Sequence, residues 1–352
     1  MNKFPSKEYE LIRRIQAVLP PVNRHSSQYE VMIGDDAAIR VNRTAGERLI
    51  ITADVSVENV HFSTDTTTFE ETGYRAMASN LSDCAAMGAK PDGAVVQLVF
   101  PKRGVNNAGI DDINGAIEQI YAGFSKACRR WNFPLVGGDL SGGGVWTIGI
   151  TLIGSAPPGR RLLKRTGVID GDALWVTGLP GESAAGLAAL TRWGRGGVPP
   201  RYNRFVEAHI TPQPAVDEGL ALAAAPFVHA MMDLSDGLSK DVATLCFDNN
   251  LGFIFDADAE KSVPRIMMGL ADELQTDFRE WFYHGGEEYE LLFACDPSVE
   301  PRGICVDVDN IAKSRPNITR LGHFTSETRD VLIRGADGNT EELRMKSWDH
   351  FK

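Results

Sequence analysis

The sequence is poor in cysteine, and none of its cysteines stand in a CxxC pair. An odd number of cysteines without this spacing argues against a zinc knuckle and against a disulfide framework, and favours free thiols in a reducing compartment. No apolar run approaches the ~18–20 residues that cross a bilayer, and the polar start has no signal-peptide core. We therefore expect a cytoplasmic protein with no membrane partner. The five cysteines are Cys84, Cys128, Cys246, Cys295 and Cys305.

Positive charge is also scarce, with 36 Lys and Arg against 47 Asp and Glu and a net charge of −11. A nucleic-acid partner is not expected, because it would require a basic surface. Phosphate ligands remain possible if metal cations stand between carboxylates and phosphates. Several signatures are absent, namely GxxxxGK[ST], GxGxxG, HRD with DFG, and GxSxG. Their absence argues against a P-loop, a dinucleotide-binding turn, a protein kinase and a serine hydrolase.

The 352 residues are 43% hydrophobic, enough to bury the core of two domains. Apolar runs alternate irregularly with helical patterns, which predicts an α/β or α+β protein. The segment 156–167, rich in Pro, Gly and basic residues, divides the chain into domains 1–155 and 156–352. Expected helices are 6–19, 68–87 (opened by a capping box of Thr68 and Glu71), 111–130, 182–193 and 239–248. Expected strands are 47–54, 94–100, 133–139 (ending in a tight glycine turn), 145–154, 173–178, a strand that begins at 228, 251–257 and 289–295.

Aspartates follow apolar runs, beside glycine or small residues, at five places in the chain. A carboxylate at a strand tip lies at the rim of a sheet, and small neighbours let a ligand approach the backbone. Any single instance is equally typical of a turn. Five together favour an oxygen-rich site for a hard cation such as Mg²⁺. The five segments are GDDAA 34–38, TAD 52–54, NLSD 80–83, GGD 137–139 and DLSDG 233–237.

The sequence does not decide the roles of several other residues and segments. The glycine-rich segments 137–144 and 285–286 could present backbone N–H groups to phosphates, or form simple turns. The basic residues 160–165 are either a solvated linker or cations that reach the phosphates of ATP. His61 could be packed, exposed or catalytic. Trp348 could anchor the chain end in the core or stack on a ligand ring.

Taken together, these motifs resemble the thiamine-monophosphate kinase family, part of the superfamily of aminoimidazole ribonucleotide synthetase. The combination of NLSDCAAMGA and GGEEYELLF is typical of this kinase within the superfamily, and the resemblance covers nearly the whole chain in order. The segments that carry it are GDDAA 34–38, TADVSVENVHF 52–62, NLSDCAAMGAKP 80–91, GGD 137–139, GRRLLKRTG 159–167, LSDGL 234–238, GGEEYELLF 285–293 and WDHF 348–351.

The resemblance implies ATP-dependent phosphorylation of thiamine monophosphate to the diphosphate by direct in-line transfer with several Mg²⁺ ions. It also implies two α/β domains in a homodimer, with the N-terminal domains building a β-barrel across the interface. It places the metal ions on Asp36, Thr52, Asp54, Asp83, Asp139, Asp233 and Asp236, of which Asp236, Asp54 and Asp83 are the catalytic candidates. It assigns ATP to Tyr121, Gly138, Asp139, Arg165 and Ser235, and the thiamine substrate to His61, Glu287 and Trp348.

The chain departs from the family pattern at Ala53, Ser56, Asn59 and Glu288, where Thr or Ser, Leu, Gly and Asp are usual. These departures affect the fine geometry of the site more than the reaction class. Two alternatives follow. One is another ATP-using enzyme of the superfamily. A selenophosphate synthetase or a hydrogenase-maturation enzyme is disfavoured because this chain lacks the N-terminal or C-terminal reactive cysteine. The other alternative is a non-catalytic protein that binds metal or nucleotide.

Overall fold

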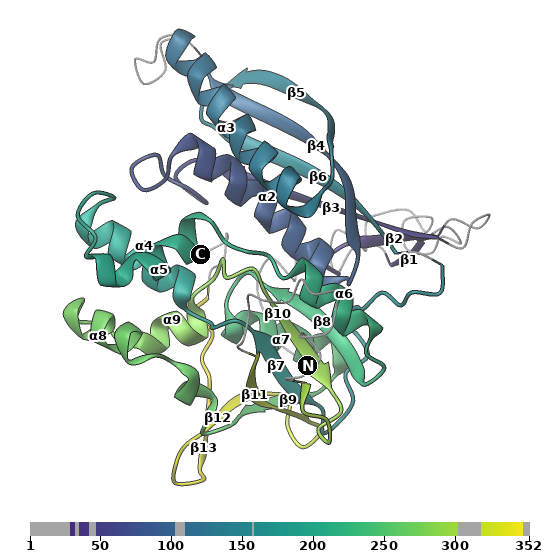
Figure 1. The fold of residues 1–352 in the computed structure, drawn as a ribbon. Coiled ribbons are helices and arrows are strands. Elements are labelled where there is room, and N and C mark those ends of the chain that lie inside the picture. Colours follow the sequence, from purple (N-terminus) through teal and green to yellow (C-terminus); the bar gives the residue numbers. More distant parts are fainter. Residues whose placement is uncertain are drawn as a thin grey trace.

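The computed structural model describes residues 29–31, 35–41, 47–102, 110–156, 158–301 and 318–347 (Figure 1). The expected helix 6–19, Cys305 and Trp348 lie outside the described residues. Among the described helices, none has the length and apolar character of a membrane span. The described residues form two layered units, each built on its own sheet.

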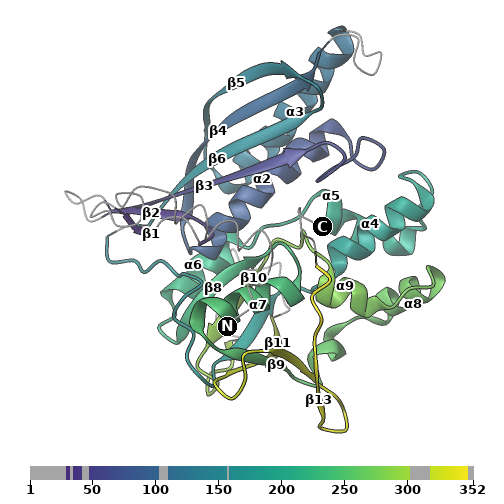
Figure 2. The same ribbon diagram turned by 180° about the vertical axis from the view of Figure 1, so that it is seen from behind.

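The first unit contains a six-stranded sheet with the strand order β1-β2-β3-β6-β4-β5. Neighbouring strands are antiparallel except β4 and β5, which are parallel because helix α3 carries the chain back between them. Helices α2 and α3 cover one face of this sheet (Figure 2). Its elements are β1 (Tyr29–Val31), β2 (Ala38–Val41), β3 (Arg48–Val57), α2 (Phe69–Ala86), β4 (Lys90–Pro101), α3 (Ile110–Trp131), β5 (Leu135–Gly143) and β6 (Thr147–Ala156).

The second unit contains a seven-stranded sheet with the order β13-β12-β9-β11-β7-β10-β8. Its pairs are antiparallel except β9 with β12. The strands are β7 (Ala173–Thr177), β8 (Val228–Leu234), β9 (Gly252–Phe255), β10 (Glu290–Cys295), β11 (Ile318–Thr325), β12 (Val331–Arg334) and β13 (Thr340–Glu342). The helices are α4 (Glu182–Trp193), α5 (Asn203–Ile210), α6 (Val216–Ala224), α7 (Leu238–Asn249), α8 (Arg265–Glu273) and α9 (Phe278–His284).

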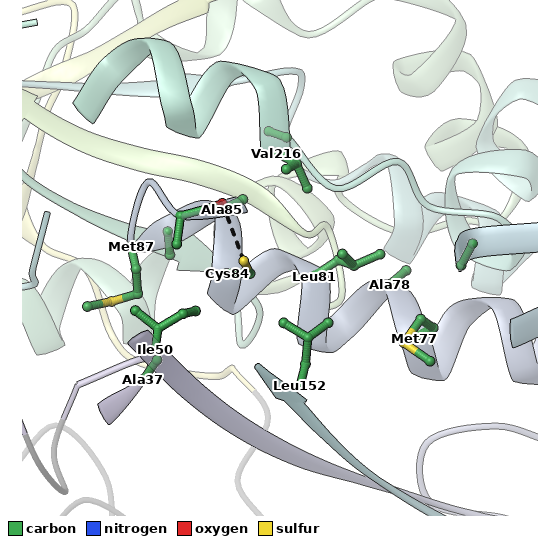
Figure 3. Packing of buried hydrophobic residues seen from close by; sticks show 14 of the residues in the cluster. Ala37, Ile50, Met77, Ala78, Leu81, Cys84, Ala85, Met87, Leu152 and Val216 are labelled. Atoms are coloured by element: carbon green, nitrogen blue, oxygen red, sulfur yellow. Dashed lines mark hydrogen bonds between the residues drawn. The ribbon is translucent and has the colours of Figure 1, made fainter. Parts of the chain in front are cut away.

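Helix α2 joins the two units, because it contacts β3 and β6 of the first sheet as well as α6, β8 and β10 of the second unit. The predicted capping box starts it: Thr68 Oγ1 accepts from the Glu71 N–H, and the Glu71 carboxylate accepts from the Thr68 N–H. Its apolar side, with Met77, Leu81 and Cys84, is fully buried against residues of both units (Figure 3). Removing this apolar surface from water fixes the position of the helix, and with it the position of its polar side.

The expected strands and helices of both units are present among the described residues, with one error at β5. The sequence predicted a strand over 133–139 that ends in a tight glycine turn, but the strand continues to Gly143 and pairs with β4 throughout. At Gly138 a Cβ atom would lie 2.2 Å from the Val96 carbonyl oxygen. The glycine therefore permits close strand pairing here, and does not mark a turn. The sheet of one chain is open, with β1 and β5 at its edges.

Candidate active site

A cavity of about 1020 Å³ lies between the two units, along the polar side of α2. One side of α2 lines it with Thr72, Arg75, Ala76, Ser79 and Asp83, which follow the spacing of a single helix face. Other walls come from β3, the loop 60–62, the end of β8, the segment 284–289, and residues of α4 and α5. Residues from both units therefore meet in one space.

Three carboxylates converge at one end of this cavity. One oxygen each of Asp36, Asp83 and Asp233 lies within 4.8 Å of the others. Asp36 precedes β2, Asp83 is in the last turn of α2, and Asp233 is near the end of β8. Asp54 on β3 and Asp236 after β8 line the same cavity. The apolar runs thus bring acidic side chains from four distant segments to one place.

Hydrogen bonds hold the carboxylates of this acidic cluster. The Thr52 hydroxyl donates to Asp83, and Ser82 Oγ donates to Asp233 Oδ2 over 3.0 Å. Asp36 Oδ2 is buried and has no hydrogen-bond partner in the part of the chain that the structure describes. A buried carboxylate oxygen without a donor is costly, so this atom points to a cation as its natural partner.

The electrostatics of the cluster also favour a cation. Burial raises the pKa of Asp83 well above its usual range, and repulsion from Asp54, Asp233 and Asp36 raises it further. Burial and the charge of Asp36 likewise raise the pKa of Asp233, and burial raises that of Asp54. For Asp35, burial and the neighbouring Asp36 raise the pKa to about 7. Hard oxygen donors in a compact acidic set suit Mg²⁺, which would relieve this repulsion.

Two cations of the chain already touch the acidic residues. The Arg165 guanidinium donates to Asp36 through Nε, over 3.0 Å, and through Nη2. Lys240 Nζ, on α7, lies 2.7 Å from Asp236 Oδ2. Both side chains are largely buried, so their charges act on these carboxylates with little screening by water.

The turn at 235–237 is shaped by a residue that the sequence analysis missed. Asp241 Oδ2 accepts the backbone N–H groups of Ser235, Asp236 and Gly237 over 3.1–3.2 Å. These bonds fix the predicted ATP residue Ser235 and the predicted catalytic residue Asp236 at the start of α7. An acidic residue in the first turn of a helix was the available signal, because it satisfies free N–H groups there.

At the other end of the cavity lie two predicted substrate residues, His61 and Glu287, together with Arg75. Arg75 Nη1 donates to the His61 carbonyl oxygen over 2.9 Å, and Nη2 forms an ion pair with Glu287. His61 Nδ1 accepts from the Val57 N–H over 3.1 Å. Arg75 is 4% exposed, and the sequence analysis did not single it out. From the sequence alone, an arginine in a helix is expected at the surface. Its burial here depends on contacts with the second unit, which the sequence pattern does not show.

The segment 285–290 has an unusual backbone, since Glu287 and Tyr289 both have positive φ, at 62° and 54°. Glu288 between them is buried and accepts from the N–H groups of Gly181 and Ser183, over 3.0 and 3.2 Å, at the start of α4. This anchor holds the neighbouring Glu287 in the cavity. Glu288, which differs from the family pattern, therefore has a structural role at the start of a helix.

Some predicted site residues lie elsewhere. Across the sheet, Asp54 of β3 pairs with Ile150 of β6, Ile150 pairs with Val96 of β4, and Val96 pairs with Gly138 of β5. Gly138 and the adjacent Asp139 are thus three strands, or about 14 Å, from Asp54. Asp139 is exposed on the edge strand and accepts from Ser141 Oγ.

Tyr121 is also apart from the acidic cluster. It lines a second hollow, of about 570 Å³, beside Arg129 and Phe133. Within one chain, the structure therefore does not bring Tyr121, Gly138 or Asp139 to the acidic cluster. Ala53 alternates with Thr52 and Asp54 along β3, so its side chain lies on the opposite face of the strand from theirs.

Comparison with known proteins gives consistent matches over most of the chain. Two family models match, the AIR synthase related protein N-terminal domain over residues 34–156 and its C-terminal domain over residues 170–333. A curated thiamine-monophosphate kinase from Synechococcus elongatus is 33% identical over 296 residues, which cover 82% of each chain. That of Bacillus subtilis is 30% identical over 349 residues, covering 98% of this chain and 99% of the relative.

Solved structures match as well. One described as AaThiL complexed with AMPPCP and TMP superposes with a TM-score of 0.79 at 25% identity, covering 98% of this chain and 97% of the other. The crystal structure of a thiamine-monophosphate kinase from Stenotrophomonas maltophilia K279a gives a TM-score of 0.69 at 29% identity, covering 94% and 97%.

Proposed function

We propose the function of this chain from the premise that it belongs to the thiamine-monophosphate kinase family. The chain transfers the γ-phosphoryl group of ATP to thiamine monophosphate and releases thiamine diphosphate and ADP. The observation that carries this proposal is the convergence of Asp36, Asp83 and Asp233 within 4.8 Å in the cavity between the two units. A related structure, AaThiL, is described in complex with AMPPCP and TMP, an ATP analogue and the substrate.

In this reaction a terminal phosphate oxygen of thiamine monophosphate attacks the γ-phosphorus of ATP in line with the bond to the β–γ bridging oxygen. That bond breaks, and its electron pair leaves with ADP. A phosphate monoester has a second pKa of about 6, so the attacking oxygen is already ionised at neutral pH. No side chain has to act as a strong general base. This fits a site that is rich in carboxylates.

Mg²⁺ held by the acidic cluster would neutralise the phosphate charges as donor and acceptor approach. The chain's own residues prepare this site. Thr52 and Ser82 orient the carboxylates of Asp83 and Asp233. Arg165, bonded to Asp36, stands where a guanidinium can also contact the phosphates of ATP. Asp241 keeps Ser235 and Asp236 at the rim.

We extend the proposal to a homodimer. Among the described residues, nothing covers the face of the six-stranded sheet away from α2 and α3, and this face is partly apolar, with Val55 54% and Ile153 36% exposed. A second copy that closes this face into a barrel across the interface would cover these residues. It could also carry its own Gly138 and Asp139, which lie on an edge strand, towards the acidic cluster of its partner. This arrangement would give Gly138, Asp139 and Tyr121 their proposed part in ATP binding.

The proposal includes the boundary between domains at residues 155 and 156, which coincides with the end of β6. The substrate end of the site comprises His61 and Glu287 beside Arg75. Lys346 and Ser347, which precede Trp348, line the same cavity. An aromatic ring such as Trp348 would stack on the cationic thiazolium ring. A cytoplasmic location, and the absence of nucleic-acid and membrane partners, stay predictions.

A coupled assay of ADP release tests the function. We expect ADP formation that requires both thiamine monophosphate and a divalent cation, with thiamine diphosphate as the second product. Turnover only with a different phosphorylated acceptor would indicate another member of the superfamily. Binding of ATP and substrate without turnover would indicate a protein that has lost catalysis.

A further inference from the structure

Helix α2 runs along the cavity between the two units. Arg75 and Asp83 lie on the same side of this helix, eight residues apart, which corresponds to about 12 Å along its axis. Ala76 and Ser79 line the cavity between them. The acidic cluster is at the Asp83 end. A substrate that lies along α2 with its phosphate at that cluster would have its other end near Arg75.

The Arg75 side chain is fixed at that end by contacts to two separate segments. Nη1 donates to the His61 carbonyl oxygen of the first unit, and Nη2 contacts Glu287 of the second unit. Nε is buried and has no hydrogen-bond partner among the described residues, although Arg75 lines the cavity. A buried N–H group without an acceptor is costly, so this atom is available for an acceptor on a ligand. His209 lines the same end, and burial together with the charge of Arg75 lowers its pKa.

We propose, on the basis of the proposed function, that Arg75 binds the aminopyrimidine ring of thiamine monophosphate and determines the selectivity for it. A free donor on Arg75 and a carboxylate acceptor on Glu287 stand next to each other. The edge of an aminopyrimidine offers the complementary pair, a ring nitrogen that accepts and an amino group that donates. A phosphate role for Arg75 is disfavoured, because two of its three nitrogens are bound to His61 and Glu287, about 12 Å along α2 from the acidic cluster.

The test compares two substrates that share one phosphate arm. The first is thiamine monophosphate. The second is the N-methylthiazolium phosphate, which keeps the cationic ring and the phosphate but lacks the aminopyrimidine. Affinity is measured by calorimetry with AMPPCP and Mg²⁺, and kcat/KM by ADP release. For Arg75→Met we expect about 10- to 100-fold weaker use of thiamine monophosphate, the worth of a hydrogen bond to a charged group. The smaller compound should change less than threefold.

Arg75→Lys and a control variant complete the design. Lysine keeps the charge but cannot make all three contacts, so we expect this variant to lose the selectivity for thiamine monophosphate together with some thermal stability. This variant also serves if Arg75→Met does not fold. Arg279→Lys, which alters an exposed ion pair with Glu260, should leave both substrates unaffected.

Equal losses on both substrates, or no loss on either, would overturn the role of Arg75, as would full selectivity in Arg75→Lys. Failure of the wild-type enzyme to phosphorylate thiamine monophosphate would instead refute the proposed function. The two failures are therefore distinguishable.

Discussion

Replacing Asp83 by Asn should make the metal-free protein more stable and the enzyme inactive. Asp83 has carboxylate oxygens of Asp36 and Asp233 within 4.8 Å. At this distance two unit charges repel by about 3 kcal/mol at an effective dielectric constant of about 20. The Arg165 guanidinium offsets the charge of Asp36, so the net repulsion removed is closer to that of one pair. Asparagine has nearly the same shape and can still accept the hydrogen bond from Thr52.

We therefore expect Asp83→Asn to stabilise the metal-free protein by about 1–3 kcal/mol at pH 8. For a unit of this size the gain corresponds to about 2–4 °C in Tm per kcal/mol. The assay is thermal unfolding in EDTA. At pH 5 the gain should shrink, because the carboxyl groups with raised pKa are then protonated in the wild type and repel less. The same variant should lose at least 100-fold in kcat, since we propose Asp83 as a metal ligand.

Asp258→Asn is the matched control, because Asp258 is an exposed residue paired with Lys261. It should change stability by less than ~1 kcal/mol and leave activity intact. A metal-free Asp83→Asn protein that is less stable than the wild type at pH 8 would refute the account, since the cluster would then not be held under repulsion. Full activity of the variant at saturating Mg²⁺ would refute its role in catalysis.

Three further predictions concern the whole protein. Because of raised pKa values, such as that of Asp35 at about 7, the folded state binds more protons than the unfolded chain above pH 4. The metal-free protein should therefore lose stability from pH 4 to pH 8. Unfolding in EDTA measures this, and a stability that rises over this range would contradict it. Glu288→Ala leaves two N–H groups at the start of α4 without their acceptor, so urea unfolding should detect a loss of about 1–3 kcal/mol, and Glu288→Gln a smaller one. Val55→Lys on the open sheet face should yield folded monomers in sedimentation equilibrium, whereas a monomeric wild type would contradict the dimer.

Local patterns in the sequence predicted much of the fold. The capping box at Thr68 and Glu71 identified the start of α2. Apolar runs identified the strands β3 to β10, whereas β1, β2, β11, β12 and β13 were not predicted. These signals are local, because caps and periodicity depend on neighbouring residues. The glycine pair in β5 was misread for the same reason. Glycine is common in turns, and only the approach of β4 to within 2.2 Å of a Cβ at Gly138 explains it there.

The acidic cluster was predicted in part. Aspartates that follow apolar runs indicated a metal site, and Asp36, Asp83 and Asp233 do converge. Asp139 follows the same pattern but lies about 14 Å away within one chain, because strand order and register are not encoded locally. Arg75 and Asp241 were missed, since charged residues in helices usually face water. Their roles depend on packing between segments that are distant in sequence.

The central claim is that acidic side chains from distant segments hold the cations that join the two phosphates. Crystals grown with Mn²⁺, AMPPCP and thiamine monophosphate test it most directly through anomalous scattering. The account predicts Mn²⁺ peaks in contact with Asp36, Asp83 and Asp233, between the γ-phosphate of the analogue and the substrate phosphate. If both ligands are bound but Mn²⁺ peaks occur only at the outer surface, with no metal ion at these three carboxylates, the claim is contradicted.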